Sequence, residues 1–183
     1  REISIHYHGA PRYGIQFFPD RSQVYTVFTT SQWMVCVDAP DDKATLRLTV
    51  VLPHGLRMVA NGRLESQKNE PDGKTRFRWR QDTPVPTYTF GFAAGRFQAT
   101  SEQHGGIRLR YLASAYSGPE LRRIFRLTSD MISFYEERAG VRYADKSYTQ
   151  VLAAGGVAQE MSGFTAIRES YAKDVLADET AVW

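Results

Sequence analysis

The stretch RFRWR at residues 76–80 alternates strictly between arginine and a large aromatic side chain. Successive side chains of a β-strand point to opposite faces of the sheet, so this pattern predicts a strand with one charged face and one buried face. The stretch IRLRY at residues 107–111 repeats the pattern, with two arginines opposite three apolar side chains. Half-buried strands therefore decide the fold of this part of the chain.

The same period of two extends outward from these strands, over residues 3–8 and 44–50. Turn signals separate the runs: Pro53-His54-Gly55, Asn61-Gly62 and Pro71-Asp72-Gly73. Asn-Gly supplies the positive φ that both central positions of a type I′ hairpin require. Several short strands at this spacing predict an antiparallel β-sandwich or a curved sheet up to residue 113.

The character of the sequence changes near residue 114. Ser117-Gly118-Pro119-Glu120 predicts the start of a helix, because Pro lies just inside it and an acid lies in its first turn. Apolar residues from Leu121 to Tyr135 then fall on one helical face, and Gly140 can end the helix in the left-handed conformation. This part of the chain is expected to contain helices as well as strands.

Two further strands and the start of a helix are expected before the end of the chain. The strands run from Ser147 to Leu152 and from Phe164 towards Tyr171, and the helix opens from Asp178 to Trp183. Both ends of the chain lie inside elements and the first residue is not Met, which predicts that the chain is an internal piece of a longer polypeptide.

The composition is that of an ordinary globular protein, with 42% hydrophobic and 23% charged residues. The net charge of +3 arises from 23 basic and 20 acidic residues, a smaller excess than nucleic-acid binders usually show. No apolar run approaches the length of a membrane span. We therefore expect neither a nucleic-acid partner nor a membrane segment in this chain, while the cellular compartment stays open.

Few residues offer chemistry of their own. His6, His8, His54 and His104 include no pair at the i, i+4 spacing of a helical metal site, so no metal ligand is predicted in this chain. Cys36 sits in an apolar run and is expected to be buried and inert. The sequence contains no G-x-S-x-G elbow and no glycine-rich phosphate loop, which argues against serine hydrolases, kinases and dehydrogenases.

The arginine stripes allow two interpretations. A basic face for phosphates would consist of Arg76, Arg78, Arg80, Arg108 and Arg110. However, the aromatic residues beside the first three point to the opposite face, where they could not stack on bases next to the charges. A solvated sheet face is the favoured interpretation.

One more segment stands out: GGVAQEMSG at residues 155–163, a glycine-flanked loop with a single carboxylate, Glu160. Most such acids are exposed and have no function, so composition alone leaves the role of this loop undecided.

Several short motifs resemble the gluzincin zinc aminopeptidases of the aminopeptidase N type. Residues 33–44, WMVCVDAPDDKA, are similar to a stretch of that family in which Cys, Asp and Pro precede a Lys-Ala strand start. The matching residues are Cys36, Asp38, Pro40, Lys43 and Ala44. The motifs that follow in family order are Val51-Leu52-Pro53-His54-Gly55, Asn61-Gly62, Pro86-Thr87-Tyr88 and Gly95-Arg96-Phe97. Each is weak alone, whereas their order and spacing together are specific.

The resemblance also covers the glycine-flanked loop. Residues 141–163 are similar to the family's approach to its exopeptidase motif, Gly-Ala-Met-Glu-Asn. Ala158 and Glu160 match that motif, while Val157, Gln159 and Met161 replace its Gly, Met and Asn. The resemblance implies that residues 1–113 are the back of a β-rich N-terminal domain. It implies that residues 114–183 open a thermolysin-like α+β catalytic domain.

A function follows from the resemblance: removal of N-terminal amino acids from peptides that have a free N-terminus. Glu160 would bind the α-amino group, with Gly156, Val157, Ala158 and Gln159 lining the substrate. The zinc ligands, the general base and an oxyanion-stabilising tyrosine would lie beyond Trp183. The full-length protein is thus expected to be a zinc-dependent hydrolase, and this chain alone to be inactive, with no catalytic or metal-binding residue.

Two alternatives remain. The first is a non-catalytic scaffold or peptide-binding relative of the same family, which the altered loop supports. The second is a β-sandwich module that binds polyanions through its arginine face, with a steep dependence on salt.

Overall fold

Three β-sheets make up most of the protein, whose computed structural model describes residues 2–178. The first sheet has the order β1-β2-β7-β4, the second β3-β6-β5 and the third β11-β12-β10-β9-β8. Strand bounds in the first two sheets are β1 (Gly14–Phe18), β2 (Gln23–Val27), β3 (Lys43–Pro53), β4 (Arg57–Ala60), β5 (Arg63–Asn69), β6 (Lys74–Pro86) and β7 (Phe92–Gly95). Those of the third sheet are β8 (Gln98–His104), β9 (Ile107–Ala113), β10 (Ser147–Ala153), β11 (Gln159–Met161) and β12 (Phe164–Arg168).

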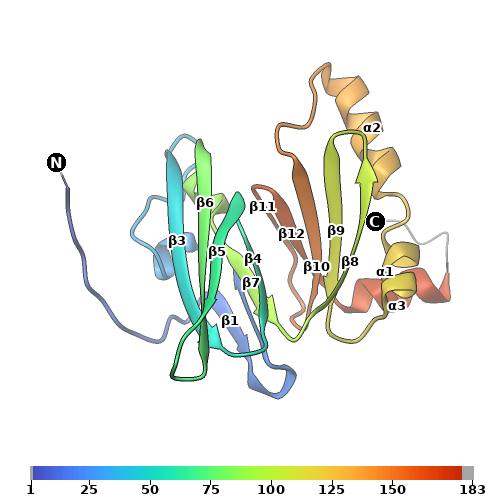
Figure 1. The fold of residues 1–183 in the computed structure, drawn as a ribbon. Coiled ribbons are helices and arrows are strands. Elements are labelled where there is room, and N and C mark those ends of the chain that lie inside the picture. The colour runs from blue at the N-terminus through green and yellow to red at the C-terminus, as the bar shows by residue number, and fades with distance from the viewer. Residues whose placement is uncertain (1, 179–183) are drawn as a thin grey trace.

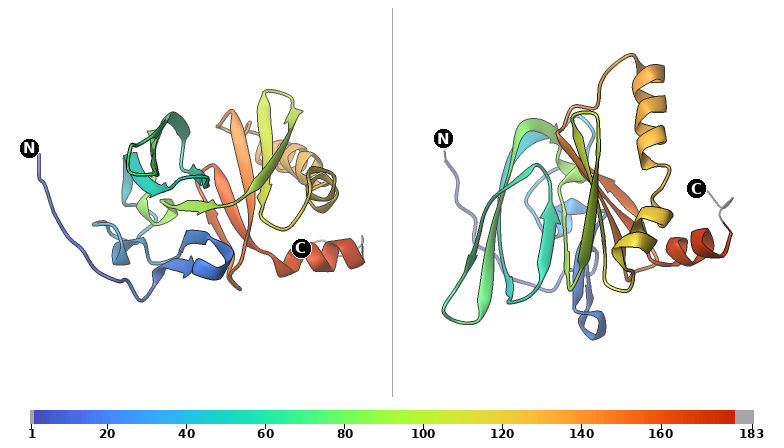
Figure 2. Two further views of the ribbon diagram at one scale, coloured as in Figure 1. Left: turned by 60° about the horizontal axis from the view of Figure 1, so that its bottom comes forward. Right: turned by 45° about the vertical axis from the view of Figure 1, so that its right-hand side comes forward.

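The first two sheets are antiparallel throughout, whereas the third is mixed, because β10 runs parallel to both β9 and β12. The predicted fold class, an antiparallel β assembly followed by an α+β segment, is confirmed. In Figure 1 the second sheet lies on one side of the molecule, and the helices cover the far side of the third sheet. The two other orientations in Figure 2 show the same layers.

The helices are short. They are α1 (Gly118–Ile124), α2 (Thr128–Ala139), α3 (Ser170–Ala177) and the 3-10 turns η1 (Pro19–Arg21), η2 (Thr30–Gln32) and η3 (Thr87–Thr89). The predicted helix start at Ser117 is confirmed, and Gly140 follows α2 with a φ of 69°. The apolar face expected to continue to Tyr135 is divided between α1 and α2, which are separated by residues 125–127.

The alternating arginine strands behave as predicted. Phe77 and Trp79 are 1% and 4% exposed, and they belong to a core that joins side chains of all three sheets. The centre of the third sheet packs against other elements on both faces. Leu112 of β9 enters that first core, whereas Leu109 packs into a second core against the helices. A sheet covered on both sides is expected where strands run parallel.

One expected strand is absent, and another is shorter than predicted. Residues 3–7 form no strand, and Ile3 is 81% exposed, because this segment pairs with no other strand in residues 2–178. The strand from Phe164 ends at Arg168, and Tyr171 already belongs to α3. The helix expected from Asp178 to Trp183 falls almost wholly outside the described residues.

The expected boundary between residues 113 and 114 coincides with the end of β9, and it stays a prediction. The third sheet takes strands from both sides of this boundary, since β8 and β9 precede it and β10 to β12 follow it. The two parts of the chain are therefore joined by continuous β-pairing as well as by the polypeptide.

Candidate functional site on the edge strand

Glu160 occupies the middle of β11, which lies at the edge of the third sheet and pairs on one side with β12. Its neighbours Gln159 and Met161 are buried, whereas Glu160 is exposed, as the period of two requires. The strand therefore presents one carboxylate on the face of the sheet that the helices cover, and its outer edge pairs with no strand of residues 2–178.

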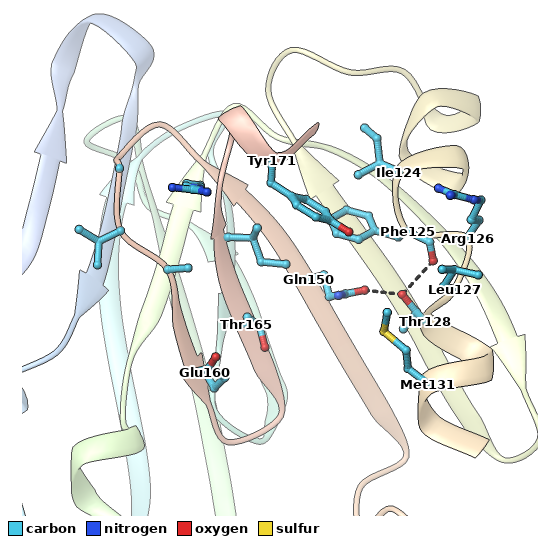
Figure 3. A pocket seen from close by; sticks show the side chains of 15 residues that line it. Ile124, Phe125, Arg126, Leu127, Thr128, Met131, Gln150, Glu160, Thr165 and Tyr171 are labelled. Atoms are coloured by element: carbon cyan, nitrogen blue, oxygen red, sulfur yellow. Dashed lines mark hydrogen bonds between the residues drawn. The ribbon is translucent and has the colours of Figure 1, made fainter. Parts of the chain in front are cut away.

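A cavity of about 500 Å³ opens beside this carboxylate, between β10 to β12 and the junction of α1 and α2. Figure 3 shows Glu160 and Thr165 on one side of it and Thr128 and Met131 on the other. The lining residues are Ile124, Phe125, Arg126, Leu127, Thr128, Met131, Gln150, Gly156, Val157, Ala158, Glu160, Thr165, Ile167, Arg168 and Tyr171. Among the described residues, Glu160 is the one carboxylate in this lining.

A hydrogen bond fixes the far wall of the cavity. The Thr128 hydroxyl donates to Gln150 Oε1 at 2.7 Å, and both residues line the cavity (Figure 3). This bond joins the first turn of α2 to the centre of β10. The wall opposite Glu160 is therefore held to the same sheet that carries the carboxylate.

A second hollow, of about 670 Å³ and more apolar, continues from the first along α2. Glu160 also lines this hollow, together with Tyr148, Met161 and Tyr135. Burial, and to a smaller extent the Glu160 carboxylate, raises the pKa of Tyr148, whose hydroxyl lies 2.6 Å from Thr165 Oγ1. The surroundings of Glu160 thus combine hydroxyls and apolar walls with further charged groups: Arg126 and Arg168 line the first cavity, and Glu136, Arg142 and Asp145 line the second. Because Glu160 is the one carboxylate among the described residues that line the first cavity, it is the group there that can pair with a cation.

Four of the five predicted site residues line the first cavity: Gly156, Val157, Ala158 and Glu160. The side chain of Gln159 lies elsewhere. Its Nε2 donates to the Tyr88 carbonyl at 3.4 Å, and its Oε1 accepts from the backbone N–H of Phe28. Gln159 is 5% exposed and ties β11 to the N-terminal half of the chain.

The loop before β11 is held by residues that sequence analysis did not single out. The Tyr25 hydroxyl lies 2.8 Å from Gln16 Oε1 and 3.3 Å from the Val157 carbonyl, and Gln23 Oε1 accepts from the Ala154 N–H at 2.9 Å. A Cβ at position 155 would lie 1.9 Å from the Tyr25 hydroxyl oxygen, so this close approach requires Gly155. These partners are more than a hundred residues from the loop, and no local sequence pattern indicates them.

Asn61 has a different role from the one predicted. Of the pair Asn61-Gly62, only Gly62 has a positive φ, so the predicted type I′ turn is not formed. Asn61 is fully buried, and its Nδ2 donates to the carbonyls of Thr89 and Ser162 at 2.8 and 3.0 Å. Its Oδ1 accepts from the Gly91 N–H at 2.7 Å. Asn61 therefore links the first sheet to the β11–β12 turn.

No metal site is formed by residues 2–178, where no group of three or more His, Cys, Asp or Glu side chains could hold an ion. The four histidines offer no ligand set around Glu160. Residues 2–178 therefore do not fit a zinc centre of their own. None of the helices in this range is long and apolar enough to cross a membrane.

Cys36 is half-buried, and the run around it is open to solvent, with Val35 and Val37 66% and 64% exposed. The expected burial of this run is wrong, because the segment from Trp33 to Asp42 is irregular and belongs to no sheet. Burial and then the charge of Asp38 raise the pKa of the thiol, which lowers its reactivity at neutral pH.

The five arginines of the alternative basic face lie on two different sheets. Arg76 pairs with Glu70 at 2.6 Å, and Arg80 pairs with Asp82. Arg108 and Arg110 lie on the third sheet instead. The five arginines therefore form no single basic surface, which removes the structural basis of the polyanion-binding module.

Residues 22–89 match the Peptidase M1 N-terminal domain. Leucine aminopeptidase 2 of Aspergillus fumigatus is 38% identical over 63 residues, which is 33% of this chain and 10% of that protein. The chain belongs to the M1 aminopeptidase family. The family indicated by the short motifs is thereby confirmed, whereas the exopeptidase loop stays a prediction.

A longer stretch of this M1 chain resembles another protein. Transcription initiation factor TFIID subunit 2 of Caenorhabditis elegans is 31% identical over 146 residues, or 73% of this chain and 13% of that protein. Aminopeptidase A of Legionella pneumophila, solved in complex with aspartic acid, has the same fold. It superposes with a TM-score of 0.74 over 86% of this chain and 20% of its own, at 17% identity. The M1 chain thus spans between a tenth and a fifth of the length of these relatives.

Proposed function

We propose that this chain provides the substrate-recognition strand of an M1 aminopeptidase, with Glu160 binding the free α-amino group of a peptide. The observation that carries the proposal is the position of Glu160 as the one carboxylate, among the described residues, in a cavity of about 500 Å³ that Arg126 and Arg168 also line. A carboxylate pairs with an ammonium group through charge-assisted hydrogen bonds. A peptide end would therefore be preferred over an internal segment, which has no such charge.

The edge position of β11 supports the same proposal. A strand whose outer edge is unpaired can accept an extended peptide by adding its backbone to the sheet. Gly156, Val157 and Ala158 lead into this edge and line the cavity. The residue that follows the bound amino group would then lie towards the apolar hollow beside Met161 and Tyr148.

Hydrolysis belongs to the full-length protein in this proposal. Zinc, which serves in M1 enzymes as the Lewis acid that activates water, would be held by residues outside 2–178. The contribution of the described residues is to bind and orient the peptide end. We infer on this basis that the chain by itself binds peptides without cleaving them.

The test uses the full-length protein and an aminoacyl-p-nitroanilide beside its N-acetylated form. We expect turnover of the free-amino substrate only, and a loss of about 100-fold or more in kcat/KM for Glu160→Gln, which keeps the shape and removes the charge. Glu137→Gln, an exposed glutamate of α2, is the matched control and should leave turnover unchanged. Equal turnover of the acetylated substrate, or full activity of Glu160→Gln, would refute the proposal.

A second candidate is a binding protein of the M1 fold without catalysis. The observation in its favour is that the similarity to the TFIID subunit covers 73% of this chain, against 33% for the leucine aminopeptidase. Val157, Gln159 and Met161 also depart from the enzyme motif. This candidate predicts saturable binding of peptides with a free N-terminus to the folded full-length protein, still dependent on Glu160, with no release of amino acids.

A further inference from the structure

A groove of about 570 Å³ lies on the face of the third sheet opposite to Glu160, between that sheet and strands β5 and β6. Figure 1 shows these strands beside the third sheet on the side that the helices leave free. The groove is lined by Gly62, Arg63, Leu64, Trp79, Ala99, Thr100, Ser101, Arg108, Arg110 and Ser147. Among the described residues, this lining includes three arginines and no acid.

Arg108 and Arg110 are two residues apart on β9, so their side chains leave the sheet on the same face. Ser101 pairs with Arg110 and Ser147 with Arg108 across the neighbouring strands, which places two hydroxyls beside the guanidinium groups. Within residues 2–178 neither arginine side chain forms a hydrogen bond or an ion pair. The third arginine, Arg63, is already engaged by Glu65 and Asp82 at 3.4 and 3.6 Å.

Arg110 is half-buried, and burial followed by the positive charges of Arg108 and Arg57 lowers its pKa. A partly buried guanidinium group beside other positive charges is destabilised until an anion neutralises it. Trp79, which lines the groove, is 4% exposed, and its buried Nε1 makes no hydrogen bond within residues 2–178. Buried donors of this kind normally have an acceptor.

The size of the ligand follows from the boundaries of the groove. A smaller cavity of about 240 Å³ adjoins it past Arg63, and this cavity is lined by Asp82 and Asp145. A long polyanion would meet these carboxylates, whereas a single oxyanion group would stay among the arginines. We propose that Arg108 and Arg110 form a binding site for a small oxyanion, a phosphate or a carboxylate group, beneath Trp79.

The test is calorimetric titration of the full-length protein with inorganic phosphate and, separately, with citrate, at constant ionic strength. We expect saturable binding with a Kd below about 1 mM for at least one of them. Arg110→Gln and the more exposed Arg108→Gln should each weaken it about tenfold or more, since each removes a charge-assisted contact. Binding of phosphate alone would identify a phosphorylated ligand, binding of citrate alone a carboxylate ligand, and binding of both a general oxyanion site.

Arg78→Gln is the matched control, because Arg78 is exposed and lies on the second sheet. It should leave both titrations unchanged. Thermal unfolding of each variant shows whether it is folded. If Arg110→Gln does not fold, Arg108→Gln tests the site. Absence of binding to the folded full-length protein, or an equal loss in Arg78→Gln, would overturn the proposal. Because the readout is anion affinity, a failure here leaves the role of Glu160 untouched.

Discussion

Gln159 and Glu160 are adjacent in β11, yet their side chains connect opposite parts of the molecule. Gln159 is buried and bonded to the backbone of Phe28 and Tyr88, whereas Glu160 faces the cavity beside α2. Phe28 and its neighbour Thr29 both have a φ of 47°, a left-handed conformation that residues with a Cβ rarely adopt. A strained turn in the N-terminal half therefore presents the N–H that fixes β11.

The first prediction concerns this link. Gln159→Ala removes both hydrogen bonds and leaves the Phe28 N–H without its partner, which should lower the free energy of unfolding by about 1–3 kcal/mol. In the full-length protein it should raise KM for free-amino substrates, because Glu160 is then held less firmly. Denaturant unfolding and steady-state kinetics measure the two effects. Gln67→Ala, on the exposed face of β5, is the control, and an equal effect there would contradict the assigned role.

The second prediction compares two adjacent glycines. Gly155→Ala places a methyl group 1.9 Å from the Tyr25 hydroxyl oxygen, while a Cβ on Gly156 meets nothing within 4 Å. We expect a destabilisation of about 1–3 kcal/mol for the first substitution and less than about 0.5 kcal/mol for the second.

A double-mutant cycle tests the cause. Tyr25→Phe removes the hydroxyl that the new methyl group would strike, so it should restore part of the stability lost in Gly155→Ala. Additive losses in the double mutant would show that the clash lies with other atoms.

Strands and helix ends were predicted correctly where the sequence pattern is local. The alternation in β6 and β9, the helix start at Ser117 and the end of α2 at Gly140 all depend on residues a few positions apart. The same local pattern failed at residues 3–7, because a strand needs a partner as well as a period of two. Around Glu160, four cavity-lining residues were named from the family resemblance. The roles of Tyr25, Gln23 and Asn61 could not be predicted, since their partners are distant in the chain.

The third prediction concerns Asn61. Asn61→Ala removes the partners of one buried backbone N–H, at Gly91, and of two partly buried carbonyls, at Thr89 and Ser162. We expect a loss of about 2–3 kcal/mol in the free energy of unfolding. Asn69→Ala breaks one bond, to the Thr75 hydroxyl at 3.0 Å on an exposed strand, and should cost less than about 1 kcal/mol. Similar losses for the two variants would show that Asn61 does not link the sheets.

The last prediction is a dependence on pH. Glu120 Oε2 accepts from the backbone N–H and from the hydroxyl of Ser117, both at 2.7 Å, and these bonds lower the pKa of the carboxyl group. A folded-state pKa below the unfolded value means that this stabilisation is present above the unfolded pKa of about 4.3 and is lost as pH falls through the folded pKa. The wild-type protein should therefore lose more stability than Glu120→Gln between neutral and acidic pH.

Thermal unfolding of the two proteins across that range measures the difference. The gap between their midpoints should be largest near neutral pH and should shrink once the wild-type carboxyl group is protonated. Glu137→Gln, with an exposed glutamate in the body of α2, should show no such convergence. A gap that stays constant across the whole range would mean that the Glu120 carboxylate stabilises the start of α1 without any contribution from its charge.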